Sequence, residues 1–339
     1  MKKIRLIWLP VIVIMGIQCI FVCSCNKEDK ELPGLTTGAV TKVTDNSACC
    51  CAAVTQEGSS DMWEKGICWC TTNNPTKTKM NGFSLNTKDT GSYECALTGL
   101  LPNTTYYVRA FATNHEGTAY GNEISFETQP TVTDFDGNVY HTVRIGDQVW
   151  MAENLKVTKY RNGDPIPEVA NNEWGDLTTG AWCELHEPYN KGYGKLYNFY
   201  ALLDVRYLAP EGWHVATDED WKTLEGTVDS QYPVGDVPWD LLGERGSDAG
   251  GNLKSTTDPW IQPNVGATDK YGFSALPGGY RDWNYGGFLT CGEGAHFWTS
   301  TEYVHVEDAY YRAIFNNSSR IVRYHGSKQG GGSVRCVKD

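Results

Sequence analysis

Nine cysteines that follow residue 25 are the first side chains whose type could do chemistry. Cys68 and Cys70 stand two residues apart, so both thiols lie on one face of a strand and point at a neighbouring strand. Cys-x-x-Cys pairs with zinc spacing do not occur. Thiols in an oxidising compartment pair by default, so we predict disulfides. The candidates are Cys50, Cys51, Cys68, Cys70, Cys95, Cys183, Cys291 and Cys336. Because nine is an odd number, at least one thiol is free, buried or bonded to another chain.

Motifs of catalytic sites are missing from the sequence. It contains no His-Glu-x-x-His zinc helix, no Gly-x-Ser-x-Gly nucleophile turn and no phosphate-binding loop. The seven His are scattered, and no two of them flank a carboxylate at helical spacing. Abundant acids leave open a glycosidase-type pair, because two such carboxylates need only meet in space. We therefore expect no enzyme and no cofactor.

Aromatic residues in loops form the second group that could contact a ligand. Nine of the twelve Trp follow residue 131, so some must be partly exposed. Aromatic faces beside amide and carboxylate groups suit sugar rings. The loop candidates are Trp174, Trp182, Trp239, Trp260, Trp283 and Tyr285. The run from Asp282 to Gly287 is typical of an exposed loop, and we predict ligand contacts at Trp260, Asp282, Trp283, Asn284 and Tyr285.

Length and charge limit the kind of protein that must position these residues. The 339 residues predict about two domains. A net charge of -12, from 41 acids and 29 bases, argues against nucleic acid as a partner. Many Gly, Trp and Tyr with only five Met favour short strands and turns over helical bundles. Ordinary hydrophobic and charged fractions exclude a largely disordered chain.

Residues 1–24 have the pattern of a secretory signal. A basic start with Lys2, Lys3 and Arg5 precedes an apolar run from Ile4 to Val22. Cys25 after Ser24 resembles the lipobox of bacterial lipoproteins, which implies a lipid on Cys25, a tether over 25–33 and anchorage in the outer membrane. An uncleaved signal anchor is the alternative, because the run is nearly long enough to span a bilayer.

The charged tripeptide that follows Cys25 bears on where the lipoprotein lies. Lys27-Glu28-Asp29 resembles the signal that sends Bacteroidetes lipoproteins to the cell surface. It implies exposure on the outer face, whereas a plain solvated tether would leave the protein facing the periplasm.

Short alternating runs over residues 34–130 predict an antiparallel β-sandwich. The expected strands are 38–43, 48–55, 63–71, 92–97, 105–114 and 118–128. The run from Leu97 to Asn114 resembles the E–F turn and F strand of a fibronectin type III domain, including its tyrosine corner. In a Bacteroidetes variant that this segment resembles, the strand-C cysteine, here Cys68, pairs with Cys50 or Cys51. The resemblance implies a spacer.

Residues 131–339 carry a series of ordered blocks. They include 134–156, 193–201, 209–221, 272–281, 297–302 and the end 333–339. These blocks resemble the Fibrobacter succinogenes major paralogous domain, whose relatives have C-type-lectin-like and sulfatase-modifying-factor folds. The resemblance implies an α+β domain with two helices, a small sheet and long loops, after an all-β fibronectin III-like sandwich.

Local patterns predict both helices of this domain. Thr217 can cap a helix whose first turn is acidic and whose buried face carries Trp221, Leu224 and Val228. Leu196, Phe199, Tyr200 and Leu203 predict the other helix, and Trp213, Trp221 and Trp298 are expected in the core.

Two departures from related proteins affect the chemistry expected of this domain. Ala209 stands where relatives carry a cysteine, so Cys336 has lost its usual partner, and Cys183 or Cys291 could replace it. Formylglycine-generating enzymes have a catalytic cysteine pair in the interval where this chain holds Cys291 alone. Gln262-Pro263-Asn264 resembles a lectin calcium motif, which makes Gln262 and Asn264 remote candidates for metal ligands. The alternative is that the segment is a structural turn.

We therefore predict a surface-anchored lipoprotein with a non-catalytic binding or adhesion head, whose ligand is a glycan or an extracellular protein. The first alternative is a structural subunit of a surface appendage or polysaccharide-capture assembly. The second is a degenerate enzyme of the formylglycine-generating type.

Overall fold

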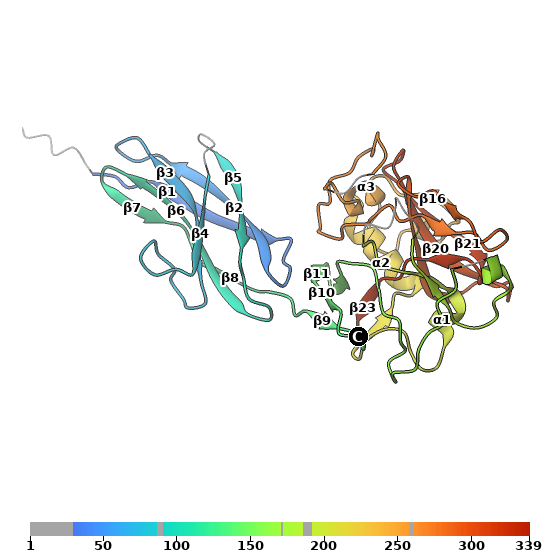
Figure 1. Ribbon diagram of the computed structural model, residues 1–339. Helices are drawn as coiled ribbons and strands as arrows, with labels where there is room; N and C mark the ends of the chain where they lie inside the picture. The colour runs from blue at the N-terminus through green and yellow to red at the C-terminus, as the bar shows by residue number, and fades with distance from the viewer. Residues whose placement is uncertain (1–29, 87–90, 171, 186–191, 258–259) are drawn as a thin grey trace, which may run out of the picture.

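The computed structural model describes residues 30–86, 91–170, 172–185, 192–257 and 260–339. Strands dominate, with 40% of the residues in strands and 10% in helices. Figure 1 shows two bodies joined by the segment that follows β8, which we call the first unit and the second unit. Cys25 and the predicted signal and tether up to residue 29 lie outside the described residues. Within the described ranges, no helix is long and apolar enough to cross a membrane.

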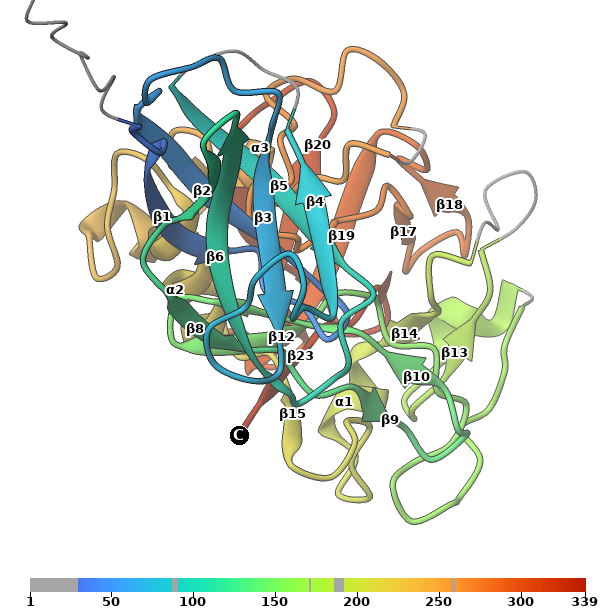
Figure 2. The same cartoon turned by 90° about the vertical axis from the view of Figure 1, so that its left-hand side faces the viewer.

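The first unit is a fibronectin III-like sandwich of two antiparallel sheets, which Figure 2 shows as two layers. One sheet has the order β1 (Gly34–Thr41), β2 (Ser47–Gln56) and β5 (Ser92–Thr98). The other has the order β4 (Gly82–Leu85), β3 (Glu64–Cys70), β6 (Thr105–Asn114) and β7 (Gly117–Tyr120), and β8 (Ile124–Glu127) also pairs with β6. The last expected strand is thus split in two, and β4 is an additional strand. The Tyr106 hydroxyl accepts a hydrogen bond from Leu101 N at 3.0 Å, which is the tyrosine corner expected from the sequence.

All nine described cysteines are free thiols, so the predicted disulfides are not formed in this structure. The cysteines that were predicted to form disulfides and are free thiols here are Cys50, Cys51, Cys68, Cys70, Cys95, Cys183, Cys291 and Cys336. Cys68 lies on β3 and its Sγ is 3.5 Å from the carbonyl oxygen of Arg109, whereas Cys50 lies on the opposite sheet with its Sγ 3.4 Å from the carbonyl oxygen of Cys51. Burial raises the pKa of Cys50 to about 12 and that of Cys68 to about 11, which keeps both thiols protonated.

The second unit is built from three small sheets and short helices (Figure 1). One sheet has the order β11 (Thr142–Ile145), β12 (Gln148–Met151), β23 (Cys336–Lys338) and β15 (Trp213–Val215). The next has the order β13 (Trp182–Cys183), β14 (Leu196–Asn198), β22 (Gly331–Gly332), β17 (Tyr280–Arg281) and β18 (Phe288–Leu289). The third has the order β16 (Gly243–Arg245), β21 (Ile321–Ser327), β20 (Asp308–Phe315) and β19 (Gly294–Glu302). β9 (Val132–Thr133) and β10 (Val139–Tyr140) form a separate short pair.

Helices are a minor part of this unit. They are α1 (Phe199–Leu203), α2 (Asp218–Val228) and α3 (Ala249–Leu253), with single 3-10 turns at Asn172–Asp176 and Val237–Asp240. α2 begins as expected, because Thr217 and Asp220 form a reciprocal capping box. Its Trp221, Leu224 and Val228 are buried, which confirms the predicted face. The other expected helix is only five residues long, because Leu196 belongs to β14 and Leu203 is exposed. Trp213 and Trp298 are buried, as predicted.

Candidate functional site

The sheet of β19, β20 and β21 presents a different set of side chains on each face. The register places Trp298 opposite Tyr311, and Tyr311 opposite Tyr324, so these three form one row that we call the aromatic row. One residue along, Phe297, Arg312 and Arg323 form a second row. Because side chains alternate between the faces of a strand, the two rows point to opposite sides of the sheet.

The arginine side of the sheet packs against α2 through a buried charge cluster. Asp218 accepts hydrogen bonds from Arg312 Nη1 at 2.8 Å and from Arg323 Nη2 at 2.7 Å. Glu225 accepts from Arg312 Nε at 2.5 Å and also pairs with Arg245. All five side chains are buried. Arg312 and Arg323 are cross-strand partners whose like charges would repel, so Asp218 between them is what makes the pairing tolerable.

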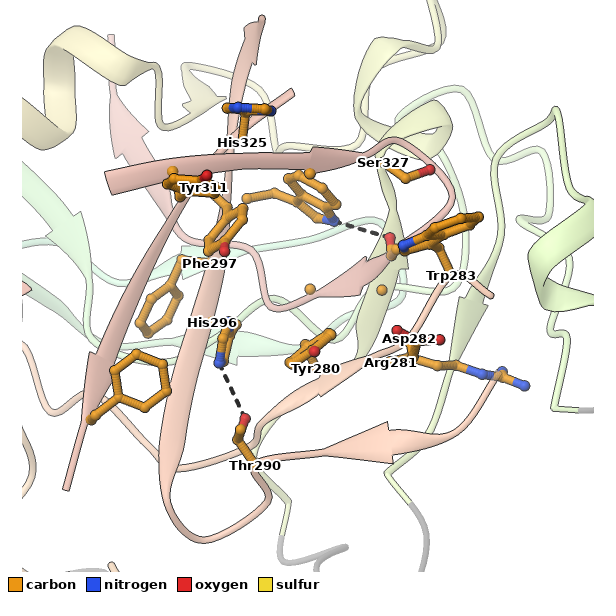
Figure 3. A pocket seen from close by; sticks show the side chains of 17 residues that line it. Tyr280, Arg281, Asp282, Trp283, Thr290, His296, Phe297, Tyr311, His325 and Ser327 are labelled. Carbon is orange, nitrogen blue, oxygen red and sulfur yellow. Dashed lines mark hydrogen bonds between the residues drawn. The ribbon is translucent and has the colours of Figure 1, made fainter. Parts of the chain in front are cut away.

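The aromatic side of the sheet lines a pocket of about 380 Å³, which is within the range of small-molecule sites. Figure 3 shows side chains from β17, β19 and β20 around this hollow, with Asp282 and Trp283 at one side. The aromatic and polar residues that line it are Tyr280, Arg281, Asp282, Trp283, Thr290, His296, Trp298, Tyr311, Phe315, Tyr324, His325 and Ser327. Phe297 also borders the pocket, although its ring packs against Trp221 of α2 on the other side of the sheet. Gly326 and the run Gly330 to Gly332 complete the lining.

Glycines at the back of the pocket allow the two sheets to approach closely. A Cβ on Gly331 would lie 2.8 Å from Arg281 Cβ and 2.9 Å from a ring carbon of Trp174. A Cβ on Gly332 would lie 2.9 Å from a ring carbon of Trp298. All three distances are shorter than van der Waals contact, so β22 can lie against these side chains only because both of its residues are glycine.

His296 is a buried titratable group in the pocket. Burial lowers the pKa of its imidazole to about 3, so the ring is neutral at physiological pH. Its Nε2 is 3.1 Å from the Thr290 hydroxyl, and its ring centroid is 4.6 Å from that of Tyr280. His296 therefore contributes a flat, uncharged ring and no cation.

The loop predicted to contact a ligand borders this pocket. Asp282 Oδ1 accepts hydrogen bonds from Asn284 N at 2.9 Å and Tyr285 N at 2.8 Å, which fixes the turn. Asp282 and Trp283 line the pocket, and Trp283 is 48% exposed. Asn284 and Tyr285 share the loop without lining the pocket, and Tyr285 is 78% exposed. Four of the five predicted residues therefore lie together.

Trp260, the fifth predicted residue, is only 3% exposed and belongs to the main hydrophobic core, so its expected exposure is corrected. The same correction applies to Trp174, Trp182 and Trp239, which are all buried. A domain with many loops has little sheet or helix surface to build its core, and large rings from the loops supply it.

Gln262 and Asn264, the remote metal candidates, lie in a turn near Lys254. The buried Lys254 ammonium donates to the carbonyls of Val265 at 2.6 Å, Phe315 at 3.0 Å and Ser318 at 2.9 Å. A cationic side chain thus already holds this segment. Over the described ranges, no group of three or more His, Cys, Asp or Glu is placed to hold a metal ion.

Sequence reasoning missed the deeper half of the pocket. Tyr280, His296, Tyr311 and Tyr324 lie on strands, and alternation within 294–302 and 308–315 was the signal that could have found them.

Cys291, the residue on which the remote enzyme alternative depends, is partly buried with its Sγ 3.7 Å from the carbonyl oxygen of Gly278. Burial raises the pKa of this thiol.

The chain is similar to solved structures and matches one protein family. No curated protein matches the chain. The sensor domain of the anti-sigma factor RsgI4 of Pseudobacteroides cellulosolvens matches 29% of this chain and 95% of its own, with 17% identity and a TM-score of 0.23. The fibronectin type III domain of human fibronectin type III domain containing protein 3 matches 32% and 93%, with 17% identity and a TM-score of 0.21.

A family match covers more than half of the chain and contains the pocket. The model of the Fibrobacter succinogenes major domain spans residues 143–338, from β11 to the last strand. The block resemblance seen in the sequence is confirmed over this range. The chain therefore belongs to the Fibrobacter succinogenes major domain family.

Proposed function

We propose that the second unit is a non-catalytic binding head and that its pocket takes a glycan. The observation that carries the proposal is the aromatic row, joined by Tyr280 and Trp283, around a hollow with one carboxylate. Aromatic faces pack against the C–H faces of sugar rings, and a few polar groups fix orientation. The volume of about 380 Å³ suits one or two sugar rings at the end of a chain.

The surroundings of the head are part of the same proposal. Residues 1–24 would be a signal peptide, 25–33 a lipidated tether, 34–130 a spacer and 131–339 a C-type-lectin-like domain. The acidic chain and the surface signal after Cys25 favour a head that faces the medium, anchored in the outer membrane through lipid and without nucleic-acid partners.

Lipidation can be tested with a single substitution, because the proposed lipid is attached to the sulfur of Cys25. Replacing it in C25S is expected to abolish incorporation of an alkyne-labelled fatty acid and to release the protein from the membrane fraction. The matched control is C23S, which removes a thiol two residues away and should keep both the label and the membrane location. Fatty-acid labelling of C25S would contradict the proposal.

Loss of the exposed ring at the pocket mouth tests the binding site itself. W283A is expected to weaken glycan binding on the order of tenfold, because a stacked ring is lost while the fold is untouched. The purified full chain would be screened on a glycan array, with affinities for the hits measured by calorimetry. The control is W63A, since Trp63 is 59% exposed but belongs to the first unit.

The outcomes of that screen are distinct. An equal loss of glycan affinity in W283A and W63A would mean that the glycan binds outside the pocket. A folded chain that binds no glycan would overturn the proposed function and favour the appendage-subunit alternative. The array would be repeated in EDTA, and unchanged binding is expected if protein groups alone hold the sugar.

A further inference from the structure

The pocket contains a carboxylate oxygen that the protein does not use. Asp282 Oδ1 accepts the two backbone N–H groups of Asn284 and Tyr285. Oδ2 has no partner among the residues that the structure describes, although Asp282 lines the pocket. An ionised carboxylate accepts hydrogen bonds only, so Oδ2 is available as an acceptor for a donor on a ligand in the hollow.

Positive charge that could offset Asp282 is directed elsewhere. Among the described lining residues, the side chains that can carry positive charge are Arg281, His296 and His325. Arg281 donates to the carbonyls of Gly286, Val169 and Ala170, and it stacks on Trp174 at 4.4 Å. His296 is kept neutral by burial, and His325 Nδ1 pairs with the Asp308 carboxylate at 2.7 Å. The charges of Arg281 and Asp282 cancel in the sum, but the Arg281 side chain extends away from the hollow (Figure 3), so the Asp282 carboxylate is the charged group that a ligand in the pocket meets first.

Tyrosine hydroxyls add to the polar surface of the pocket, beside Thr290 and Ser327. Burial, and then the nearby hydroxyls of Tyr280 and Tyr324, raise the pKa of Tyr311 to about 12. Burial, and then the charge of Asp282, raise the pKa of Tyr280. Three phenols and one carboxylate thus line the same hollow, and the two pKa shifts keep Tyr280 and Tyr311 protonated. Protonated phenols can donate to the oxygens of a sugar, whereas Asp282 can accept from its hydroxyls.

We infer that the pocket selects uncharged, hydroxylated rings and rejects their carboxylated or sulfated counterparts, with the free oxygen of Asp282 as the specificity-determining group. This inference rests on the proposed glycan-binding function and narrows it. A sugar hydroxyl gains a charge-assisted hydrogen bond to Asp282, whereas an acidic substituent meets a like charge in a hollow walled by aromatic rings. Uronic acids, sialic acids and sulfated sugars are therefore poor ligands for this site.

The conservative variant D282N isolates the charge from the shape of the loop. Asparagine keeps the Oδ1 acceptor that the Asn284 and Tyr285 amides need, so the turn is preserved, while Oδ2 becomes an NH₂ donor. The matched control is D147N, because Asp147 is exposed on the turn between β11 and β12 and does not line the pocket. Both variants change the net charge of the chain by the same amount.

The experiment compares matched pairs of probes on the full chain. Galactose and glucose are titrated beside galacturonic and glucuronic acid, and binding is measured by calorimetry and ligand-detected NMR. The unmodified chain is expected to prefer the neutral member of a pair by about tenfold or more, the value of one hydrogen bond to a charged group. In D282N the affinity for the neutral sugar should fall and the affinity for the acidic sugar should rise, so that the preference for the neutral sugar falls to about threefold or less. D147N should match the unmodified chain.

The possible results separate this inference from the function on which it rests. Binding of neutral and acidic sugars with equal affinity would overturn the inference and leave glycan binding intact. An unchanged preference in D282N would assign the selectivity to another group and also overturn it. If none of the four probes binds and the glycan array is blank as well, the proposed function fails and the inference fails with it.

Discussion

Replacing Asp218 by Asn is expected to lower the free energy of unfolding by about 3–5 kcal/mol, the usual cost of breaking a buried ion pair from one side. Asp218 is the shared partner of Arg312 and Arg323, and all three side chains are buried. D218N keeps the shape but leaves two neighbouring guanidinium groups without the carboxylate that separates their charges.

Chemical denaturation of the full chain would measure this loss, with tryptophan fluorescence reporting the second unit. The matched control is D240N, because Asp240 pairs with Lys222 at 2.6 Å but is 67% exposed. An exposed pair is worth at most about 1 kcal/mol, so D240N should be nearly as stable as the unmodified chain. Equal stability of D218N and D240N would contradict the role of the charge cluster.

The same substitution has a pH signature. Burial opposes ionisation of Asp218, but hydrogen bonds and charges from Arg323 and Arg312 outweigh it and hold its pKa well below the usual range. A group whose folded pKa is depressed stabilises the protein above its unfolded pKa of about 3.9, and that contribution is lost as the pH falls further. The stability difference between the unmodified chain and D218N should therefore shrink below about pH 4.

Replacing Arg335 by Met is expected to cost about 3 kcal/mol or more, because several buried carbonyls lose their donor at once. Arg335 is fully buried and donates to the carbonyl oxygens of Met151 at 2.9 Å, Phe273 at 2.8 Å and Ser274 at 3.1 Å. Its Nε also donates to Asn154 at 2.6 Å, and its guanidinium lies 4.5 Å from the ring centroid of Phe273. Burial lowers the pKa of Arg335 to about 10, which leaves it charged at neutral pH.

In R335M, methionine fills much of the volume of the arginine side chain but has no hydrogen-bond donor. The measurement therefore isolates the contribution of the hydrogen bonds. The control is R320M, because Arg320 is exposed. Thermal unfolding followed by near-ultraviolet circular dichroism would show a lower midpoint for R335M only. A midpoint equal to that of R320M would mean that the carbonyls find other donors and that Arg335 is dispensable for the fold.

Local patterns in the sequence were sufficient for the elements that depend on near neighbours. Period-2 alternation predicted most strands of the first unit, and the capping box at Thr217 predicted the start of α2. The tyrosine corner was expected from the resemblance to a fibronectin type III domain, and the hydrogen bond between Leu101 N and Tyr106 bears it out. Loop composition alone placed Asp282 and Trp283 at a site, and the structure puts both at the pocket.

The other half of the pocket depends on pairings that local patterns do not encode. Tyr280 meets His296 only because β17 and β19 belong to sheets packed around one hollow, and the third wall comes from Tyr311 on β20. Asp218 was interpreted as a residue that favours a helix N-terminus, a role compatible with its position but minor beside its two buried arginine partners. Trp260 misled the prediction because a loop position indicates exposure only when the core is built elsewhere.

The alternation of β20 links the stability of the second unit to what its pocket displays. A slip of this strand by one residue would turn Arg312 into the hollow and Tyr311 onto α2. Asp218 and Glu225 would then stay buried without Arg312, at a cost of several kcal/mol. The charge cluster thus stabilises the observed register of β20 over the register shifted by one residue. It also frees the opposite side chains to diverge, since Tyr311 and Tyr324 can change without affecting which register is most stable.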